Sequence, residues 1–177
     1  MKEKIETLIS NTAIQKRISE IAENISADYA GESLELICIL KGGVVFMVDL
    51  AKHIKVPVTM NFMDVSSYGN HTQSSGEIKI LMDLDSPIEG KHVLLVEDII
   101  DSGRTLSKLV EHLSNRKPKS LKICTLLDKP ERRVSHVDVE YIGFTIPDAF
   151  VVGYGLDYAQ RYRNLDYIGV ISFEEEP

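Results

Sequence analysis

Carboxylates and small hydroxylated residues gather between Glu97 and Thr105, in the string EDIIDSGRT. Glu97 and Asp98 stand at the end of an apolar run, where acidic side chains are costly unless a cation or a hydroxyl group meets them. Adjacent carboxylates can accept hydrogen bonds from two neighbouring sugar hydroxyls, or they can meet a hydrated magnesium ion. The types and spacing of these residues therefore point to the binding of a sugar, a divalent metal or both.

The second half of this string, Asp101 to Thr105, leads into a helical pattern. Backbone N–H groups, the Ser and Thr hydroxyls and the helix dipole at such a place together form a cradle for one phosphate. The alternative is an ordinary loop with an N-capping Thr105 and solvated acids. That alternative accounts for the acids on their own, but the complete string favours a phosphate site.

Apolar strands and amphipathic helices alternate along the chain and must position this string. Isoleucines at helical spacing predict a helix over about 11–29, and a nearly continuous apolar run predicts a buried strand at Leu34–Leu40. A break at 41–43 is followed by another helical pattern. The same order of strand, loop and helix recurs at 93–96 and 106–113, and further strands are expected at 121–127, 141–144, 150–152 and 167–171.

This alternation predicts an α/β fold, with a parallel twisted sheet flanked by helices on both faces. Ligands of such sheets bind outside the carboxyl ends of the strands, where the 97–105 string and the 41–43 break both fall. A chain of 177 residues fits a single domain, 1–177. The polar stretch 64–77 lacks apolar anchors and predicts either a flexible active-site loop or a disordered insertion.

Composition narrows the class of protein. The hydrophobic fraction of 44% and the charged fraction of 27% are those of an ordinary globular protein, and no apolar run approaches the roughly 20 residues that span a bilayer. We therefore expect a cytoplasmic protein without a membrane partner, with Cys38 and Cys124 as reduced, buried thiols. The net charge of −7 argues against nucleic acid as the main partner, and it requires a locally positive site for any anionic substrate.

Several motifs resemble one enzyme family. VEDIIDSGRTL at 96–106 closely resembles the phosphoribosyl pyrophosphate signature of type I phosphoribosyltransferases, in the form of the hypoxanthine-guanine branch. Other pieces resemble that branch in its usual order: LKGG at 40–43, SYG at 67–69, LLDKPERR at 126–133, IPDAFVVGYGLDY at 146–158 and RNL at 163–165. The resemblance covers nearly the whole chain from about residue 34 onward. It implies the type I phosphoribosyltransferase fold in its short, bacterial-type form, with a small hood built from the N- and C-terminal segments.

The resemblance also implies a reaction of purine salvage. The 5-phosphoribosyl group of phosphoribosyl pyrophosphate passes to N9 of hypoxanthine or guanine, giving IMP or GMP and pyrophosphate. Asp101 is the implied catalytic residue, a general base that accepts a proton from N7 of the purine. The implied transition state is oxocarbenium-like, so positioning and charge neutralisation carry the catalysis.

Roles for individual residues follow from the same resemblance. Ribose and its 5-phosphate are assigned to Glu97, Asp98, Asp101, Ser102, Gly103, Arg104 and Thr105. Pyrophosphate is assigned to Leu40, Lys41, Gly42, Ser67, Tyr68 and Arg163, with the cis peptide that family members often hold before the lysine. Purine is assigned to Lys129, Phe150, Val151 and Asp157, and Mg²⁺ to Glu97, Asp98 and Asp157.

Within the purine set, Lys129 would donate to the 6-oxygen and so exclude adenine, while Phe150 would stack on the base. Without the resemblance, simpler readings stay open. The LKGG piece could be a glycine-rich turn, Lys129 and Asp157 could be solvated loop residues, and Phe150 could belong to the sheet core.

Two other classes of protein compete with this interpretation. An RNA-binding pyrimidine-operon regulator has the same fold and a similar signature, but it needs a basic surface that the net charge disfavours. A receiver-type signalling domain also places acids at strand ends, yet it has no use for a DSGRT phosphate cradle. The expected partners are phosphoribosyl pyrophosphate and 6-oxopurines, and the expected assembly is a homodimer or homotetramer. The preference among hypoxanthine, guanine and xanthine stays open.

Overall fold

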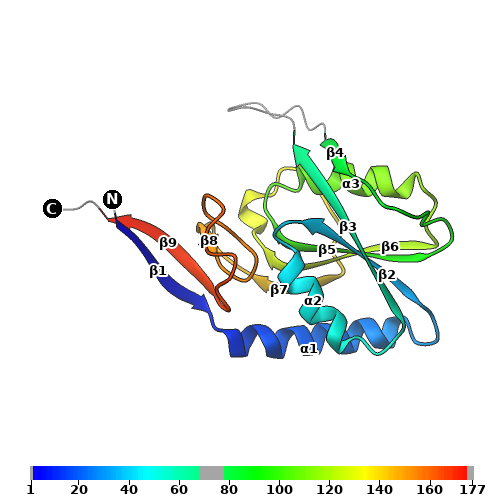
Figure 1. Ribbon diagram of the computed structural model, residues 1–177, viewed down its shortest axis with the longest axis horizontal. Coiled ribbons are helices and arrows are strands. Elements are labelled where there is room, and N and C mark those ends of the chain that lie inside the picture. Colours follow the sequence, from blue (N-terminus) through cyan, green and yellow to red (C-terminus); the bar gives the residue numbers. More distant parts are fainter. Residues whose placement is uncertain (1, 68–77, 175–177) are drawn as a thin grey trace.

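The computed structural model describes residues 2–67 and 78–174 (Figure 1). In this part of the chain a six-stranded sheet has the order β4-β3-β2-β5-β6-β7. Its strands are β2 (Leu34–Leu40), β3 (Val58–Ser67), β4 (Ile78–Met82), β5 (His92–Ile100), β6 (Ser120–Asp128) and β7 (Tyr141–Thr145). Four of the pairings in this sheet are parallel, as expected, whereas β4 runs antiparallel to β3 and makes the sheet mixed.

Three α-helices within the described residues cover the two faces of this sheet. They are α1 (Asn11–Asp28), α2 (Val44–His53) and α3 (Arg104–Ser114), and a short 3₁₀ turn follows β6 at Pro130–Arg132. Helices α1 and α2 lie on one side and α3 on the other (Figure 1).

The register of β2 shows why its sequence is apolar throughout. Leu36 and Cys38 pack into the core beneath α1 and α2, while Ile37 and Ile39 pack into the core beneath α3. Alternate residues of a strand point to opposite faces, so a strand buried on both faces needs an unbroken apolar run. The expectation of helices on both faces is therefore confirmed.

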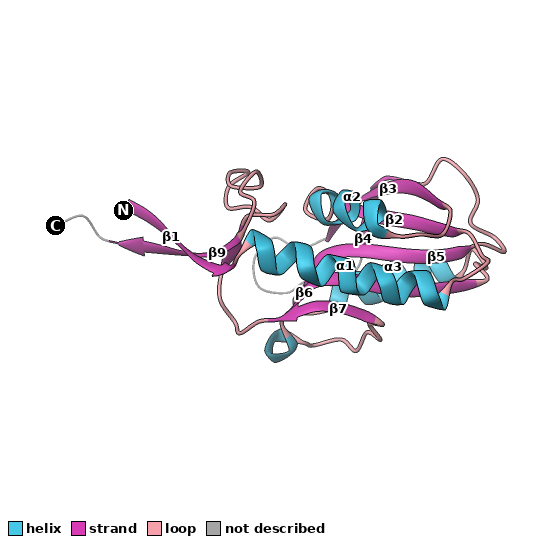
Figure 2. Ribbon diagram, turned by 90° about the horizontal axis from the view of Figure 1, so that it is seen from below, coloured by secondary structure: helices cyan, strands magenta, loops and turns pink. Residues whose placement is uncertain are grey.

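A second, three-stranded sheet with the order β1-β9-β8 forms within the described residues at the two ends of the chain. Strand β1 (Lys2–Ile9) pairs antiparallel with β9 (Ile168–Glu174), and β9 pairs with β8 (Val151–Val152). Figure 2 shows β1 and β9 projecting together from one end of the molecule. This sheet is the expected hood of N- and C-terminal segments.

The structure can be compared with three further expectations, which concern the polar stretch 64–77, the two cysteines and membrane-spanning helices. The polar stretch 64–77 begins inside β3, which continues to Ser67, and residues 68–77 lie outside the described residues. Both cysteines are buried and free, as expected. None of the helices within residues 2–67 and 78–174 combines the length and apolar character needed to cross a bilayer.

Candidate active site

The two unusual loops meet at one edge of the central sheet. Strand β5 lies between β2 and β6 and runs parallel to both, so the carboxyl ends of these strands are neighbours. The Lys41–Gly43 loop follows β2, the Asp101–Gly103 loop follows β5, and Lys129 follows β6. The topology thus brings together motifs that are separated by up to about 90 residues, at the edge where sheets of this kind bind ligands.

The loop after β2 is in close contact with both β5 and the hood. The Leu40–Lys41 peptide is cis, as the resemblance implied. A Cβ added to Gly42 would lie 1.6 Å from Oδ2 of Asp98, and one added to Gly155 would lie 2.1 Å from the carbonyl oxygen of Gly42. Only glycine fits at these two contacts, so the LKGG piece is more than a flexible turn.

Glu97 and Asp98 lie in the C-terminal part of β5, which continues to Ile100, and they are surrounded by protein on most sides but partly open to solvent. Burial, reinforced by the neighbouring Asp98 carboxylate, raises the pKa of Glu97 well above its ordinary value. Burial also raises the pKa of Asp98 to about 6, although the backbone N–H of Ile99 donates to its Oδ1 at 2.7 Å. Within the described residues neither carboxylate forms an ion pair, so both can accept hydrogen bonds from a ligand.

Arg163 and Asp157 face this acid pair from the hood. The Arg163 Nη2 atom lies 2.8 Å from Oδ1 of Asp157, and its Nη1 donates to the Gly155 carbonyl at 2.8 Å. Both residues act electrostatically on Asp98: Arg163 lowers its pKa and Asp157 raises it. The hood therefore supplies one fixed guanidinium and one carboxylate to the mouth of the site.

The three carboxylates assigned to magnesium do not form a ready-made ligand cluster. No group of three or more metal-binding side chains occurs in residues 2–67 and 78–174. The donor types nevertheless suit Mg²⁺, which is usually held by one or two carboxylates together with oxygen atoms of a phosphorylated substrate. Glu97 and Asp98 offer such a pair, and Asp157 is engaged with Arg163.

The loop Asp101–Gly103 connects β5 to the start of α3. Gly103 adopts a left-handed conformation with φ 77° and caps the helix, so the alternative of a loop with an N-capping Thr105 does not hold. Ser102 Oγ accepts a hydrogen bond from the backbone N–H of Arg104 at 3.4 Å. A tight turn of small residues at a helix N-terminus directs N–H groups and the positive end of the helix dipole at an anion.

Next to this loop lies an open pocket of about 340 Å³. The residues that line it include Asp101 and all four residues assigned to purine. The complete lining is Ile99, Asp101, Lys129, Arg132, Asp148, Phe150, Val151, Leu156 and Asp157. Lys129 is only 8% exposed, which excludes the reading of a solvated loop lysine. Phe150 is 55% exposed and meets the ring of Tyr158 edge-on at 5.8 Å, so it is not part of the sheet core.

Arg132 and Asp148 are pocket residues that the sequence analysis did not single out. The Arg132 Nε donates to Oδ1 of Asp101 at 3.1 Å, and its Nη1 lies 3.4 Å from Oδ2 of Asp148. Lys129 Nζ in turn lies 3.9 Å from Oδ1 of Asp148. The position of Arg132 within LLDKPERR was the one available signal, because ion pairs between distant segments leave no local pattern.

Two pyrophosphate assignments receive less support. Ser67 is the last residue of β3, beside β2 in the sheet, and Tyr68 lies outside the described residues.

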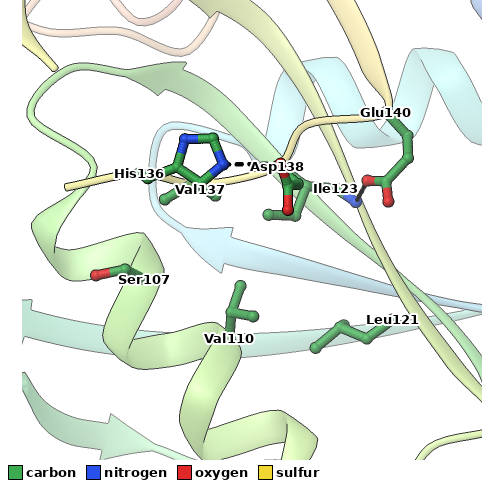
Figure 3. A pocket seen from close by; sticks show the side chains of 8 residues that line it. All are labelled: Ser107, Val110, Leu121, Ile123, His136, Val137, Asp138 and Glu140. Atoms are coloured by element: carbon green, nitrogen blue, oxygen red, sulfur yellow. Dashed lines mark hydrogen bonds and ion pairs between the residues drawn. The ribbon is translucent and has the colours of Figure 1, made fainter.

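A separate pocket of about 300 Å³ lies between α3 and the segment 136–140, and Figure 3 shows its lining residues. That pocket contains none of the predicted site residues and is not the candidate active site.

Comparison with known proteins identifies the class to which this fold and site belong. Residues 4–159 match the family model described as the phosphoribosyl transferase domain. The hypoxanthine-guanine phosphoribosyltransferase of Bacillus subtilis is 56% identical over 97% of this chain and 96% of its own length. The hypoxanthine phosphoribosyltransferase of Escherichia coli is 52% identical over 99% of this chain and 100% of its own length.

A solved structure agrees with these two relatives. The hypoxanthine-guanine phosphoribosyltransferase of Bacillus anthracis superimposes with a TM-score of 0.92 at 48% identity, covering 97% of this chain and 100% of that chain. The chain belongs to the phosphoribosyl transferase family, in its hypoxanthine-guanine branch. These relatives lend no support to the alternative of an RNA-binding regulator.

Proposed function

We propose that this protein is a purine salvage enzyme that transfers the 5-phosphoribosyl group of phosphoribosyl pyrophosphate to N9 of hypoxanthine or guanine. The products are IMP or GMP and pyrophosphate. The observation that carries the proposal is the adjacency of a helix-start phosphate loop and a pocket that contains a buried lysine, an exposed aromatic ring and the Asp101 carboxylate. The names of the relatives supply the particular bases.

The proposed roles divide the site into three parts. The Asp101–Thr105 segment binds the 5-phosphate, and the Glu97 and Asp98 carboxylates accept hydrogen bonds from the ribose hydroxyls. The LKGG piece, Ser67, Tyr68 and Arg163 bind pyrophosphate. Support comes from the contact of the LKGG loop with Asp98 and Gly155, which holds the ribose and pyrophosphate subsites side by side.

The purine base is recognised by residues that line the pocket next to the phosphate loop. Lys129 donates to the 6-oxygen, Phe150 stacks on the ring, and Val151 and Asp157 meet the edge of the purine. A buried lysine paired only loosely, at 3.9 Å, with Asp148 retains a donor for this oxygen. Adenine would present its own amino donor to the ammonium group, and a site built for an acceptor rejects such a ligand strongly.

Asp101 is the proposed general base at N7. Its carboxylate lines the purine pocket and is oriented there by Arg132. Bound Mg²⁺ would neutralise the charge of the leaving pyrophosphate, held by Glu97 and Asp98 with water-mediated help from Asp157. The protein's own contribution is to position the ribose between pyrophosphate and base and to hold the proton acceptor in place.

The remaining assignments concern the whole molecule. We take residues 1–177 as one domain and the cytoplasm as the location. A homodimer or homotetramer is supported by three exposed apolar side chains near the β4 edge of the sheet, Met60, Leu81 and Met82. Light scattering coupled to gel filtration would determine the subunit number.

The proposed reaction is tested by incubating purified protein with phosphoribosyl pyrophosphate and hypoxanthine, with Mg²⁺ or with excess EDTA. Formation of IMP and pyrophosphate in equal amounts, only when Mg²⁺ is present, is the expected result. A protein that binds phosphoribosyl pyrophosphate but forms no nucleotide from any base would contradict the proposal, and RNA binding would then be measured.

A further inference from the structure

The segment Asp128–Ser135, here called the clamp segment, runs from the end of β6 along the phosphate loop Asp101–Gly103. At its start, the backbone N–H of Lys129 donates to the Ile100 carbonyl at 3.0 Å. At its end, the N–H groups of two successive residues, Val134 and Ser135, both donate to the Ser102 carbonyl, at 2.9 and 3.0 Å. The clamp segment is therefore bonded to the backbone on both sides of Asp101.

Arg133 packs directly against the tightest point of the phosphate loop. A Cβ added to Gly103 would lie 2.5 Å from the Ser135 carbonyl oxygen and 3.0 Å from Cδ of Arg133. The stem of Arg133 and the backbone of Ser135 thus form the wall against which the left-handed turn at Gly103 rests. The loop cannot shift toward the clamp segment without moving this side chain.

The guanidinium of Arg133 is fixed by Asp128. Its Nη2 forms a short ion pair with Oδ1 of Asp128, and the two side chains are only 20% and 12% exposed. An ion pair shielded to this degree is costly to break from one side, because the remaining charge loses its partner in a poorly hydrated place. The ion pair joins Asp128, at the start of the clamp segment, to Arg133, whose side-chain stem packs against the phosphate loop.

The wall of the Gly103 turn continues past Ser135, because a Cβ added to Gly103 would lie 3.4 Å from Cγ2 of Val137, which packs against the core beneath α3. Beyond Ser135 the chain borders the pocket of Figure 3, and the side chains of His136 and Asp138 are 86% and 89% exposed. The hold on the phosphate loop is therefore shared between Val137 and the Arg133 side of the segment, and Arg133 makes the closer of the two side-chain contacts to a Cβ placed on Gly103, at 3.0 Å.

We infer that Arg133 and Asp128 are positioning residues for the 5-phosphate, acting through the backbone of Ser102 and Gly103. The inference rests on the proposed function, because the ligand of the loop is taken to be the 5-phosphate of phosphoribosyl pyrophosphate or of the product nucleotide. It goes beyond that function in assigning a task to two residues that touch neither the base nor the ribose in the proposed roles. Loss of the pair should weaken ligands that carry a 5-phosphate and spare the free purine.

The test compares Arg133→Met, Asp128→Asn and the double variant with wild type. Arg116→Met is the matched control, since Arg116 forms a partly shielded ion pair with Asp83 at 2.6 Å, with side chains 28% and 46% exposed. For each protein the KM for phosphoribosyl pyrophosphate, the KM for hypoxanthine, kcat, the Kd for GMP and the Tm are measured.

The expected result is a rise of about tenfold in both the KM for phosphoribosyl pyrophosphate and the Kd for GMP, as for a lost charge-assisted hydrogen bond. The KM for hypoxanthine should change less than about twofold, and the double variant should resemble the single ones because the residues act as a unit. The control should lower the Tm without separating the two KM values. Should Arg133→Met fail to fold, the milder Asp128→Asn variant carries the test.

Two negative outcomes are distinguishable. An active wild type whose KM for phosphoribosyl pyrophosphate is unchanged by Arg133→Met and Asp128→Asn overturns the inference and leaves the proposed function intact. Wild-type protein that forms no nucleotide refutes the proposed function itself. A rise in both KM values together, matched by the control, shows a purely structural role and also overturns the inference.

Discussion

Replacing Asp98 by asparagine should make the protein more stable and much less active. Burial raises the pKa of Asp98 from 3.8 to about 6, so the folded protein holds its charged form at a disadvantage above that pH. The shift of about 2 pH units corresponds to about 3 kcal/mol, an upper value because the carboxylate keeps some contact with solvent. The asparagine side chain of the variant keeps an oxygen that can accept from Ile99 and removes the buried charge.

The sign of the pH dependence follows from the direction of the shift. A carboxyl group whose folded pKa lies above its unfolded value has no effect on stability below the unfolded pKa, near pH 4. As the pH rises from about 4 to 6 it reduces the stability of the folded state, and above about 6 the full cost persists. The advantage of the Asp98→Asn variant should therefore be absent at pH 4, grow up to pH 6 and stay constant to pH 8.

Urea unfolding at pH 4, 6 and 8, without Mg²⁺ or substrate, measures this difference. A parallel thermal melt at pH 8 should give a Tm higher by about 6–12 °C, the shift that about 3 kcal/mol produces in a protein of this size. Asp85→Asn is the control, because this exposed carboxylate carries the same charge without the burial. An Asp98→Asn variant no more stable than wild type at pH 8, or a difference in stability that persists at pH 4, would show that the buried charge of Asp98 does not destabilise the fold.

Three further changes test other parts of the site, and a fourth tests a hydrogen-bond network among residues that are not assigned to it. Asp101→Asn should reduce kcat by about 10²–10⁴-fold while calorimetry finds phosphoribosyl pyrophosphate binding nearly unchanged; near-normal turnover would remove Asp101 as the base. Lys129→Ala should raise the KM for hypoxanthine and relax the rejection of adenine, and unchanged selectivity would remove Lys129 from base recognition. Gly42→Ala would bring a Cβ within 1.6 Å of Asp98 Oδ2 and should lower kcat/KM by about 10²-fold, so wild-type kinetics would contradict the close packing. Tyr154→Phe removes the hydroxyl that donates to Asp49 and accepts from a glutamine amide, and urea unfolding at pH 7 should record a loss of about 1–2 kcal/mol; equal stability of the two proteins would count against that bond.

The elements that the sequence predicted best are those buried on two faces. Strand β2 and helix α1 have the bounds that their apolar patterns indicated, within one residue. Both patterns arise from burial: an unbroken run in a strand between two helical layers, and a stripe at helical spacing on a helix above the sheet. Each of these patterns lies within one contiguous stretch of sequence, so it can be recognised from the sequence alone.

Strands with weaker burial were missed. Strand β1 carries charges at four of its first five positions and is held by pairing with β9, more than 150 residues away. Strand β4 is the edge of the sheet, where only one side is paired and Leu81 is 55% exposed. Pairing partners distant in sequence leave no periodic signal, so such strands need the three-dimensional structure.

The candidate site divides in the same way. Residues carried by contiguous motifs, such as Asp101 and Lys129, were predicted and line one pocket. Arg132 and Asp148 contribute through ion pairs across 31 and 16 residues, which no local pattern encodes. Arg133 and Asp128 are close in sequence, but their proposed positioning role depends on the packing of Arg133 against the Gly103 turn, which only the structure reveals.

The most direct test of the central claim is the base selectivity of the purified enzyme. Values of kcat/KM are measured with phosphoribosyl pyrophosphate and Mg²⁺ for hypoxanthine, guanine, xanthine, adenine and uracil in parallel. We predict nucleotide formation from hypoxanthine or guanine at values at least about 10³-fold above those for adenine and uracil, because Lys129 is proposed to donate to the 6-oxygen of the purine. Comparable use of adenine, or a preference for uracil, would contradict it.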